Sequence, residues 1–505
     1  MSEKEISPSR FASVFAEFIQ QVAATARRPE SQLRDRIAAH LGADPAQLPV
    51  TTEQFDTFEA PNLQLALDAY LKAEGRSGEL LGISMENKRF MAAGLSELVA
   101  RASRYQPALQ EGPVDYTNYH LANDEILACV HFGLYLVRAG ESPLVALVSG
   151  PSEFGDPRRQ RMHIEVMSSR PGDAPAFITE ITRLMRRLNV YRGHTILLSP
   201  GMQIGPGPSL LVQFQNIPRI TRDDVVLATG FLERIERHTL AFSEHAEELR
   251  ASGRSLKRGV LLFGLPGTGK TLTLMYLIGQ MPGRTVILMT GRGLGMIETV
   301  AKMARQLAPA MIVMEDVDLV AEERTMPGFR GGPILFELLN EMDGLRDDQD
   351  VIFVLTTNRA DILEPALAAR PGRIDLAVEL PLPDVHGRQR LVELYARGLQ
   401  LEDVDLDSLV ARTEGASPAY IKELLRKAAL LAIERGRPDR LRQEDVEGAL
   451  DELAQGGRLA ERILGFRPDG AAGVARVEGA PMPVEASPTG FPPQAVVFNR
   501  STKQT

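Results

Sequence analysis

Residues 260–271 read Val-Leu-Leu-Phe-Gly-Leu-Pro-Gly-Thr-Gly-Lys-Thr, so an apolar run leads directly into a glycine-rich turn. The run 260–263 predicts a buried strand, and the apolar residues in 272–278 predict a helix after the turn. Between them, the spacing Gly264-x-x-x-x-Gly269-Lys270-Thr271 is typical of a loop whose backbone N–H groups surround phosphate oxygens. The following helix directs its positive end at the same charge. The stretch therefore predicts an α/β fold with a phosphate site at the end of a strand.

The side chains of this loop suit a nucleoside triphosphate and its metal ion. Lys270 can reach the β- and γ-phosphates, and the hydroxyl of Thr271 can bind Mg²⁺. An ordinary glycine-rich turn is the alternative, and the apolar runs on both sides disfavour it. ATP and Mg²⁺ are therefore the predicted cofactors. The predicted nucleotide-binding residues are Gly264, Pro266, Gly267, Thr268, Gly269, Lys270, Thr271 and Leu272.

The composition is that of a globular protein. The chain has 505 residues, of which 44% are hydrophobic and 24% charged, with a net charge of −9. At roughly 150 residues per domain this length predicts about three domains. The acidic balance disfavours a dedicated nucleic-acid binder. Cys129 is the single cysteine, which excludes an intramolecular disulfide and favours a reducing, cytoplasmic location. The sequence has neither a secretory apolar core at its start nor a run of 18 apolar residues, so we expect no membrane span.

The region before the loop predicts two domains. Apolar residues recur at helical spacing up to about residue 104, which predicts a helical N-terminal domain over 1–113. From 114 to 222 short apolar runs predict strands around one helix, and hence a small α/β domain. The predicted helices are 10–24, 30–41, 63–73, 87–102 and 175–188. The predicted strands are 144–148, 162–167, 195–198 and 210–215.

The region around and after the loop predicts an ATP module and a tail. We expect an α/β core over 223–383 and a helical lid over 384–465, with helices at 387–399, 406–412, 418–436 and 443–455. The segment 466–505 is rich in Gly, Pro and Ala and lacks periodicity, which predicts a disordered tail. The predicted fold class is thus a parallel P-loop sheet with a helical lid, preceded by a helical region and a small α/β domain.

Two further segments predict the rest of a hydrolytic site. The apolar run 311–314 predicts a buried strand that ends in Glu315, Asp316 and Asp318. Forty-five residues separate Lys270 from Glu315, which is enough for a helix, a strand and a second helix. The carboxylates should therefore lie beside the phosphate loop, at the carboxyl ends of parallel strands. A second strand, 351–355, is followed by Asn358, which can orient the attacking water or contact the γ-phosphate.

Two arginines lie at a rigid corner, Arg370-Pro-Gly-Arg373. Guanidinium groups suit a γ-phosphate because their planar donors spread over its oxygens. A pair of surface salt bridges is the alternative interpretation.

Together, these residues resemble the AAA family of ring ATPases over about 224–464. The resemblance rests on the phosphate loop, the acid-tipped strand, Asn358 and the Arg-Pro-Gly-Arg corner, which occur in the family's order. It implies a homo-oligomer, usually a hexamer, in which Arg370 and Arg373 of one subunit complete the nucleotide site of its neighbour. It also implies that Asn358 is the first sensor residue and that 384–464 is the lid.

The chain departs from the family pattern at three places. The usual Asp-Glu pair is reversed, which puts Glu315 at the metal-coordinating position and Asp316 at the water-activating one. Because Asp is shorter by one methylene, we expect slower hydrolysis. Residues 290–297 lack the aromatic residue that grips polypeptide in threading members, and Leu294 and Met296 are candidate substitutes. Ser417-Pro418-Ala419-Tyr420 replaces Ser-Gly-Ala-Asp, although Ser417 can still cap the lid helix.

The leading hypothesis is an ATP-hydrolysing, chaperone-like machine that remodels or translocates protein clients recruited by its N-terminal domains. The alternative is a nucleotide-controlled assembly switch or scaffold that does not thread a substrate. The client is not identified by the sequence. No nucleic-acid partner is expected, because the charge is acidic and no helix-turn-helix or RNA-binding signature is found.

Overall fold

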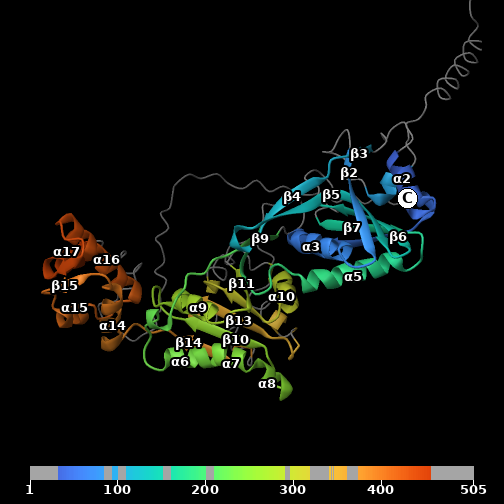
Figure 1. Cartoon of the computed structure of the whole chain (residues 1–505). Helices are drawn as coiled ribbons and strands as arrows, with labels where there is room; N and C mark the ends of the chain where they lie inside the picture. The colour runs from blue at the N-terminus through green and yellow to red at the C-terminus, as the bar shows by residue number, and fades with distance from the viewer. Residues whose placement is uncertain are drawn as a thin grey trace, which may run out of the picture.

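The computed structural model describes residues 32–84, 94–100, 110–151, 161–200, 210–289, 296–318, 340–342, 344, 346–360 and 373–455. Figure 1 shows three parts along the chain: an N-terminal sheet flanked by helices, a central sheet and a small helical unit. The central sheet is parallel over most of its width and the helical unit follows it, so the predicted α/β fold, a P-loop sheet with a helical lid, is confirmed.

Within the described residues, the N-terminal sheet has seven strands in the order β1-β7-β6-β5-β2-β3, with β4 paired to β5 outside this path. Every pair of neighbours in it is antiparallel. The strands are β1 Val50–Phe55, β2 Arg76–Ser84, β3 Gln110–Gly112, β4 Asp115–His120, β5 Ile126–Ala139, β6 Ser142–Ser149 and β7 Met162–Ser168.

Helices cover both faces of this sheet. Helices α3 (Ala60–Leu71) and α5 (Asp173–Arg187) pack on one face, and α2 (Gln32–Leu41) and α4 (Leu95–Val99) pack on the other. Strand side chains alternate between the two cores, as the period of a strand requires. In β6, Leu144, Ala146 and Val148 face α3 and α5, while Val145 and Leu147 face α2 and α4. The sheet is therefore buried on both sides.

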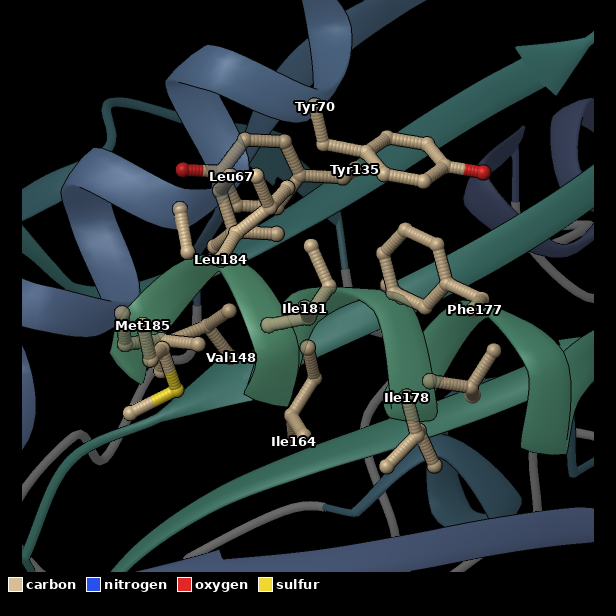
Figure 2. Close-up of a cluster of buried hydrophobic side chains, with 14 of the residues drawn as sticks. Leu67, Tyr70, Tyr135, Val148, Ile164, Phe177, Ile178, Ile181, Leu184 and Met185 are labelled. Atoms are coloured by element: carbon tan, nitrogen blue, oxygen red, sulfur yellow. The ribbon is translucent and has the colours of Figure 1, made fainter. Parts of the chain in front are cut away.

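Figure 2 shows part of the core beneath α5. Tyr70 of α3 and Ile164 of β7 lie in the same core cluster as three residues of α5: Phe177, Ile181 and Leu184. The rings of Tyr70 and Phe177 meet edge to face, with their centroids 4.8 Å apart. This face of the domain is thus closed by apolar and aromatic packing.

The boundary predicted between residues 113 and 114 does not follow the sheet. Strands β1 and β2 precede it and pair with β7 and β5, which follow it. A purely helical unit over 1–113 is therefore not what the described residues form. Strand β1 reads Val-Thr-Thr-Glu-Gln-Phe, which carries little apolar pattern, and distant pairing partners make it a strand.

Several predicted elements of this region are confirmed. The predicted helices 30–41, 63–73 and 175–188 correspond to α2, α3 and α5, and the predicted strands 144–148 and 162–167 correspond to β6 and β7. The predicted helix 10–24 lies outside the described residues, as does most of 87–102.

The central sheet has the strand order β14-β10-β13-β12-β11-β8-β9. Neighbours from β14 to β8 are parallel, and β9 is antiparallel to β8. The carboxyl ends of the parallel strands therefore lie at one edge. The strands are β8 Thr195–Pro200, β9 Leu210–Phe214, β10 Arg258–Phe263, β11 Thr285–Met289, β12 Ala310–Met314, β13 Val351–Thr357 and β14 Leu376–Glu379.

Helices also cover both faces of the central sheet. Helices α6 (Phe231–Glu236) and α9 (Lys270–Gly279) pack on one face and α10 (Ile297–Gln306) on the other. Every residue of β12 and β13 is buried, which explains the unbroken apolar runs 310–314 and 351–355. A π-helical turn, Arg237–Ala241, joins α6 to α7 (Phe242–Glu244), and α8 (Ala246–Ala251) follows.

Strands β8 and β9 correct the predicted extent of the small α/β domain. Both fall inside 114–222, yet β8 pairs with β11 of the central sheet and β9 extends that sheet. The predicted strands 195–198 and 210–215 exist, but their local sequence does not specify which sheet they join. Ile196 and Leu198 of β8 are fully buried in the core beside α10.

Residues 190–198, which include the first four residues of β8, form a junction between the two sheets. Tyr191 stacks on Phe214 and meets Phe58 edge to face, with ring centroids 5.6 and 6.2 Å apart. The guanidinium of Arg192 donates to the carbonyls of Gln306 and Ala308, each at 3.0 Å, at the end of α10. The N-terminal domain is therefore joined to the central sheet by continuous packing and hydrogen bonding.

The C-terminal unit corresponds to the predicted lid, and in Figure 1 it lies at the opposite end of the central sheet from the N-terminal domain. Asp384 caps its first helix by accepting from the N–H of Gly387 at 2.7 Å. Its elements are α14 Val385–Tyr395, β15 Gln400–Glu402, α15 Leu406–Arg412, α16 Pro418–Glu434, β16 Arg440–Arg442 and α17 Gln443–Gln455. The predicted lid helices are confirmed, and the predicted tail 466–505 lies outside the described residues.

Candidate nucleotide-binding site

The predicted phosphate loop, the acids Glu315 and Asp316, and Asn358 gather at the carboxyl ends of three adjacent parallel strands. The phosphate loop follows β10, Glu315 and Asp316 follow β12, and Asn358 follows β13. In the sheet, β13 lies between β10 and β12. The ligand-binding edge expected of an α/β sheet therefore carries the loop, the acids and the amide together.

Close approach explains why two positions of the loop are glycine. A Cβ atom at Gly264, where φ is 147°, would lie 2.5 Å from the carbonyl oxygen of Leu380. A Cβ atom at Gly267, where φ is 78°, would lie 2.8 Å from both the Cβ of Ala419 and the Oγ of Ser417. The loop is thus enclosed by the segment after β14 and by the start of α16.

Lys270 and Thr271 join the loop to the acids. The side chain of Lys270 is buried, and its Nζ donates to the carbonyls of Gly264 at 3.0 Å and Leu265 at 2.9 Å. Burial lowers the pKa of Lys270, and the carboxylates of Asp316 and Asp318 act in the opposite direction. The hydroxyl of Thr271 donates to Oε1 of Glu315 at 2.8 Å.

Asp316 and Asn358 are in direct contact. Nδ2 of Asn358 donates to Oδ1 of Asp316 at 3.2 Å, and the N–H of Asp316 donates to the hydroxyl of Thr356 at 3.1 Å. Asp316 has a left-handed backbone, with φ of 50°. A non-glycine residue rarely adopts this conformation, although Asp tolerates it better than most. The backbone therefore turns this carboxylate toward the tip of β13.

Asp318 is part of the same cluster, and the sequence assigned it no separate role. It is 5% exposed, and its Oδ1 accepts from the hydroxyl of Thr357 at 2.8 Å and from the N–H of Asn358 at 3.2 Å. The sequence feature that could have identified Asp318 is a third acid just beyond the apolar run, together with hydroxyl residues at the end of the next strand.

The structure does not bring Arg373 into the site of its own chain. A Cβ atom at Gly259 would lie 2.1 Å from the carbonyl oxygen of Arg373, so Arg373 lies at the start of β10. Gly259 is five residues before Gly264, a distance of about 16 Å along a strand. Arg373 therefore lies near the opposite edge of the sheet from the loop. Arg370 lies outside the described residues.

The lid touches the phosphate loop directly. Helix α16 begins at Pro418, and Oγ of Ser417 accepts from the N–H of Tyr420 at 3.1 Å, as expected for the cap. The N–H of Ala419 donates to the carbonyl of Gly267 at 3.2 Å. The altered lid sequence therefore still forms the helix start and still contacts the loop.

Met296 does not have the exposed position expected of a polypeptide grip. It is 8% exposed and belongs to the apolar core beside Val300 and Met303 of α10. Met296 lies at the start of an amphipathic helix and packs against the sheet, so it contributes to the core instead of forming an exposed grip. Leu294 lies outside the described residues.

These residues fit a nucleoside triphosphate with Mg²⁺. Within the described residues, the backbone N–H groups of Gly267, Thr268 and Gly269 donate to no acceptor, which leaves them for phosphate oxygens. Lys270 supplies a buried cation beside them. The hydroxyl of Thr271 and the carboxylate of Glu315 are adjacent oxygens, which Mg²⁺ prefers as ligands.

Family profiles match this part of the chain. The profile of the ATPase family associated with various cellular activities (AAA) matches residues 260–382, and that of the AAA+ lid domain matches residues 403–448. The chain carries an AAA ATPase domain and its lid. The AAA domain is an ATP hydrolase, with ATP and Mg²⁺ as its cofactors.

The curated relatives include bacterial proteins named ATP-dependent zinc metalloprotease FtsH. FtsH 3 of Symbiobacterium thermophilum is 34% identical over 270 residues, which are 51% of this chain and 42% of the relative. FtsH 3 of Sphaerobacter thermophilus is 35% identical over 277 residues, which are 52% and 56% of the two chains. FtsH 1 of Conexibacter woesei is 36% identical over 252 residues, which are 47% and 38%. This chain thus spans about half the length of these relatives.

Among the helices that the structure describes, none has the length and apolar character needed to cross a membrane. In the described part of the chain, no group of three or more His, Cys, Asp or Glu side chains is placed to hold a metal ion. Zinc protease activity is part of the names of the relatives.

Proposed function

We propose that this chain is the subunit of a ring-shaped ATPase that remodels or translocates protein clients. The central sheet, which includes β8 and β9, and the lid perform the ATP-driven work, and the N-terminal domain built on β1 to β7 recruits the client. The observation that carries the proposal is the junction, through which the N-terminal domain continues into the sheet that bears the nucleotide site. A client held by that domain would be coupled directly to the ATPase core.

In this proposal each residue at the sheet edge has one task. The loop and Lys270 hold the phosphates, and Thr271 and Glu315 bind Mg²⁺. Bound ATP supplies the γ-phosphoryl group that is transferred to water. Asp316 takes a proton from that water, and Asn358 orients it. The contact between Asp316 and Asn358 supports this pairing.

The proposed assembly is a cytoplasmic homohexamer, with a chaperone-like role on protein rather than nucleic acid. Arg373 lies far from the site of its own chain, which supports its use, with Arg370, at the site of a neighbouring subunit. Arginine suits this task because its planar donors stabilise the charge on the γ-phosphate in the transition state.

ATP turnover tests the proposal. We expect the wild-type protein to hydrolyse ATP and to be accelerated by an unfolded protein such as casein. Asp316→Asn should remove the turnover, because an amide cannot accept the proton, and should retain ATP binding. Turnover that survives Asp316→Asn would contradict the role of Asp316, whereas DNA- or RNA-stimulated turnover would contradict a protein client.

A nucleotide-controlled assembly switch is the second candidate. It is favoured by the segment 290–297, which has no aromatic residue, and by the burial of Met296 in the core. Such a switch would assemble on ATP and release a partner on hydrolysis. Turnover that ignores casein, together with ATP-dependent assembly, would support the switch over the remodelling machine.

A further inference from the structure

Asp318 is a buried carboxylate that accepts hydrogen bonds from two uncharged donors among the described residues. It is 5% exposed, and its Oδ1 accepts from the hydroxyl of Thr357 and from the N–H of Asn358. Burying a carboxylate is costly unless hydrogen bonds replace its water. The hydrogen bonds that this carboxylate accepts must therefore offset the free-energy cost of its burial.

Those contacts continue the sheet beyond its backbone ladder. The last backbone pair between β12 and β13 is Met314 with Leu355. After it, side chains join the two strand tips: Thr356 to the N–H of Asp316, Asn358 to the carboxylate of Asp316, and Thr357 to Asp318. The hydroxyl of Thr357 also accepts from the N–H of Arg359 at 2.9 Å. Residues 357–359 at the tip of β13 are thus linked to Asp318, directly or through Thr357.

Asn358 is held at both ends by this arrangement. Its backbone N–H is bound to Asp318 and its side-chain amide to Asp316. The position of the amide relative to Asp316 therefore depends on where Asp318 holds the backbone.

We infer that Asp318 is a positioning residue, which fixes the tip of β13 so that Asn358 meets Asp316. It sets the rate of ATP hydrolysis through Asn358 and leaves nucleotide binding to the loop and Lys270. The inference rests on the proposed roles of Asp316 and Asn358.

The competing explanation is that Asp318 acts by its charge on Lys270, because the two groups interact electrostatically. Two substitutions separate these explanations. Asp318→Asn keeps an acceptor oxygen and removes the charge, whereas Asp318→Ala removes both. A positioning role predicts that Asn rescues what Ala loses, and a charge role predicts that both variants fail and bind ATP more weakly.

The experiment measures kcat, KM and binding of a non-hydrolysable ATP analogue for the full-length protein. We expect Asp318→Ala to lower kcat by about 10- to 100-fold, the cost of misplacing a catalytic group by about 1 Å. The affinity for the analogue should stay within about twofold of wild type, because the loop is intact. Asp318→Asn should lose less than about threefold in kcat.

A double variant tests whether Asp318 acts through Asn358. If it does, Asp318→Ala combined with Asn358→Ala should be no slower than Asn358→Ala alone. Losses that multiply would overturn the inference, as would a loss of analogue binding equal to the loss of kcat. If Asp318→Ala does not fold, Thr357→Val is measured in its place. It removes the hydroxyl between Asp318 and Arg359, and unchanged kcat would also overturn the inference.

Asp316→Asn, measured in parallel, separates this inference from the proposed function. If Asp316→Asn retains turnover, the proposed role of Asp316 fails whatever Asp318 does. If Asp316→Asn and Asn358→Ala are both slow while Asp318→Ala turns over normally, the proposed function stands and the inference about Asp318 fails.

Discussion

Asp316 shows how a shorter side chain can be fitted to a site. Its left-handed backbone and its contact with Asn358 place the carboxylate, so the geometry is built around Asp. We therefore expect Asp316→Glu to lower kcat, on the order of tenfold, although Glu restores the usual length at this position. Glu adopts a left-handed backbone less readily, and its carboxylate would extend beyond the amide of Asn358. A rise in kcat would mean instead that the reach of Asp limits hydrolysis.

Cys129 provides a pH-dependent prediction. It is buried, and desolvation, with a smaller contribution from the carboxylate of Asp68, raises the pKa of its thiol to about 12 from 9.0. The folded thiol thus ionises at higher pH than the unfolded one. Its neutral form favours the folded state below pH 9, and that contribution is lost as the pH rises toward 12.

Alkylation by iodoacetamide at pH 8, followed by mass spectrometry, tests this burial. Because the thiolate is the reactive form, we expect labelling in guanidinium chloride and little labelling of the native protein. The chain has a single cysteine, so one mass shift reports one site. Equal labelling rates in both states would contradict the buried, neutral thiol.

The sequence predicts the loop and the acids because their spacing along the chain is itself the chemical requirement. Lys270 and Thr271 must be adjacent, and Glu315 must end a buried strand. The role of Asp318 was not predictable in this way. Its partners are on β13, and only the strand order of the sheet brings Thr357 and Asn358 beside it.

The contact between the loop and α16 makes Gly267 a sensitive position. A Cβ atom there would lie 2.8 Å from Ala419 and Ser417. We expect Gly267→Ala to destabilise the protein by about 1–2 kcal/mol through its left-handed backbone. It should also weaken binding of an ATP analogue by about tenfold, because the start of the lid must move from the loop.

Gly436→Ala is the matched control for that experiment. Its φ of 75° is close to that of Gly267, and a Cβ atom there would meet nothing within 4 Å. It should therefore show the loss of stability without the loss of nucleotide affinity. Equal affinities for the two variants would mean that the contact between loop and lid is unimportant for binding.

Tyr191 should be the main packing residue of the junction. It is 3% exposed, it packs between the rings of Phe58 and Phe214, and its hydroxyl donates to the carbonyl of Phe58. We expect Tyr191→Ala to cost about 3–5 kcal/mol, as for other buried aromatic residues. Tyr191→Phe keeps the ring and should cost only about 1 kcal/mol. Denaturant unfolding monitored by circular dichroism measures both, and equal costs would contradict a packing role.

The strands around this junction show where prediction from sequence stops. Strands β6 and β12 are apolar enough to be recognised alone. Strand β1 is mostly polar, and β8 carries no mark of the sheet that it joins. Both are specified by partners far along the chain, so the predicted domain limits at 113 and 222 could not anticipate them.

A ring assembled from two inactive variants tests the proposed use of Arg373 across subunits. Arg373→Ala retains its own loop, and Lys270→Ala retains its arginine. Mixed in one ring, the arginine of a Lys270→Ala subunit can complete the site of an Arg373→Ala neighbour. We expect each variant alone to be nearly inactive and an equal mixture to recover up to about a quarter of wild-type turnover, since interfaces form at random. Co-expression with two affinity tags and ATP assay of the doubly purified ring measures this, and a mixture without recovery would contradict completion by a neighbour.

The place of β8 in the central sheet also has a mechanical consequence. The connection between the N-terminal domain and the central sheet is short, because β8, which is hydrogen-bonded to β11, begins four residues after Tyr191. A force on the N-terminal domain would therefore act directly on β8. Tension along β8 is shared by several hydrogen bonds, which must yield together rather than one at a time. In the proposed machine, a movement of the central sheet would therefore pass through β8 to the N-terminal domain and to the client that we propose this domain holds.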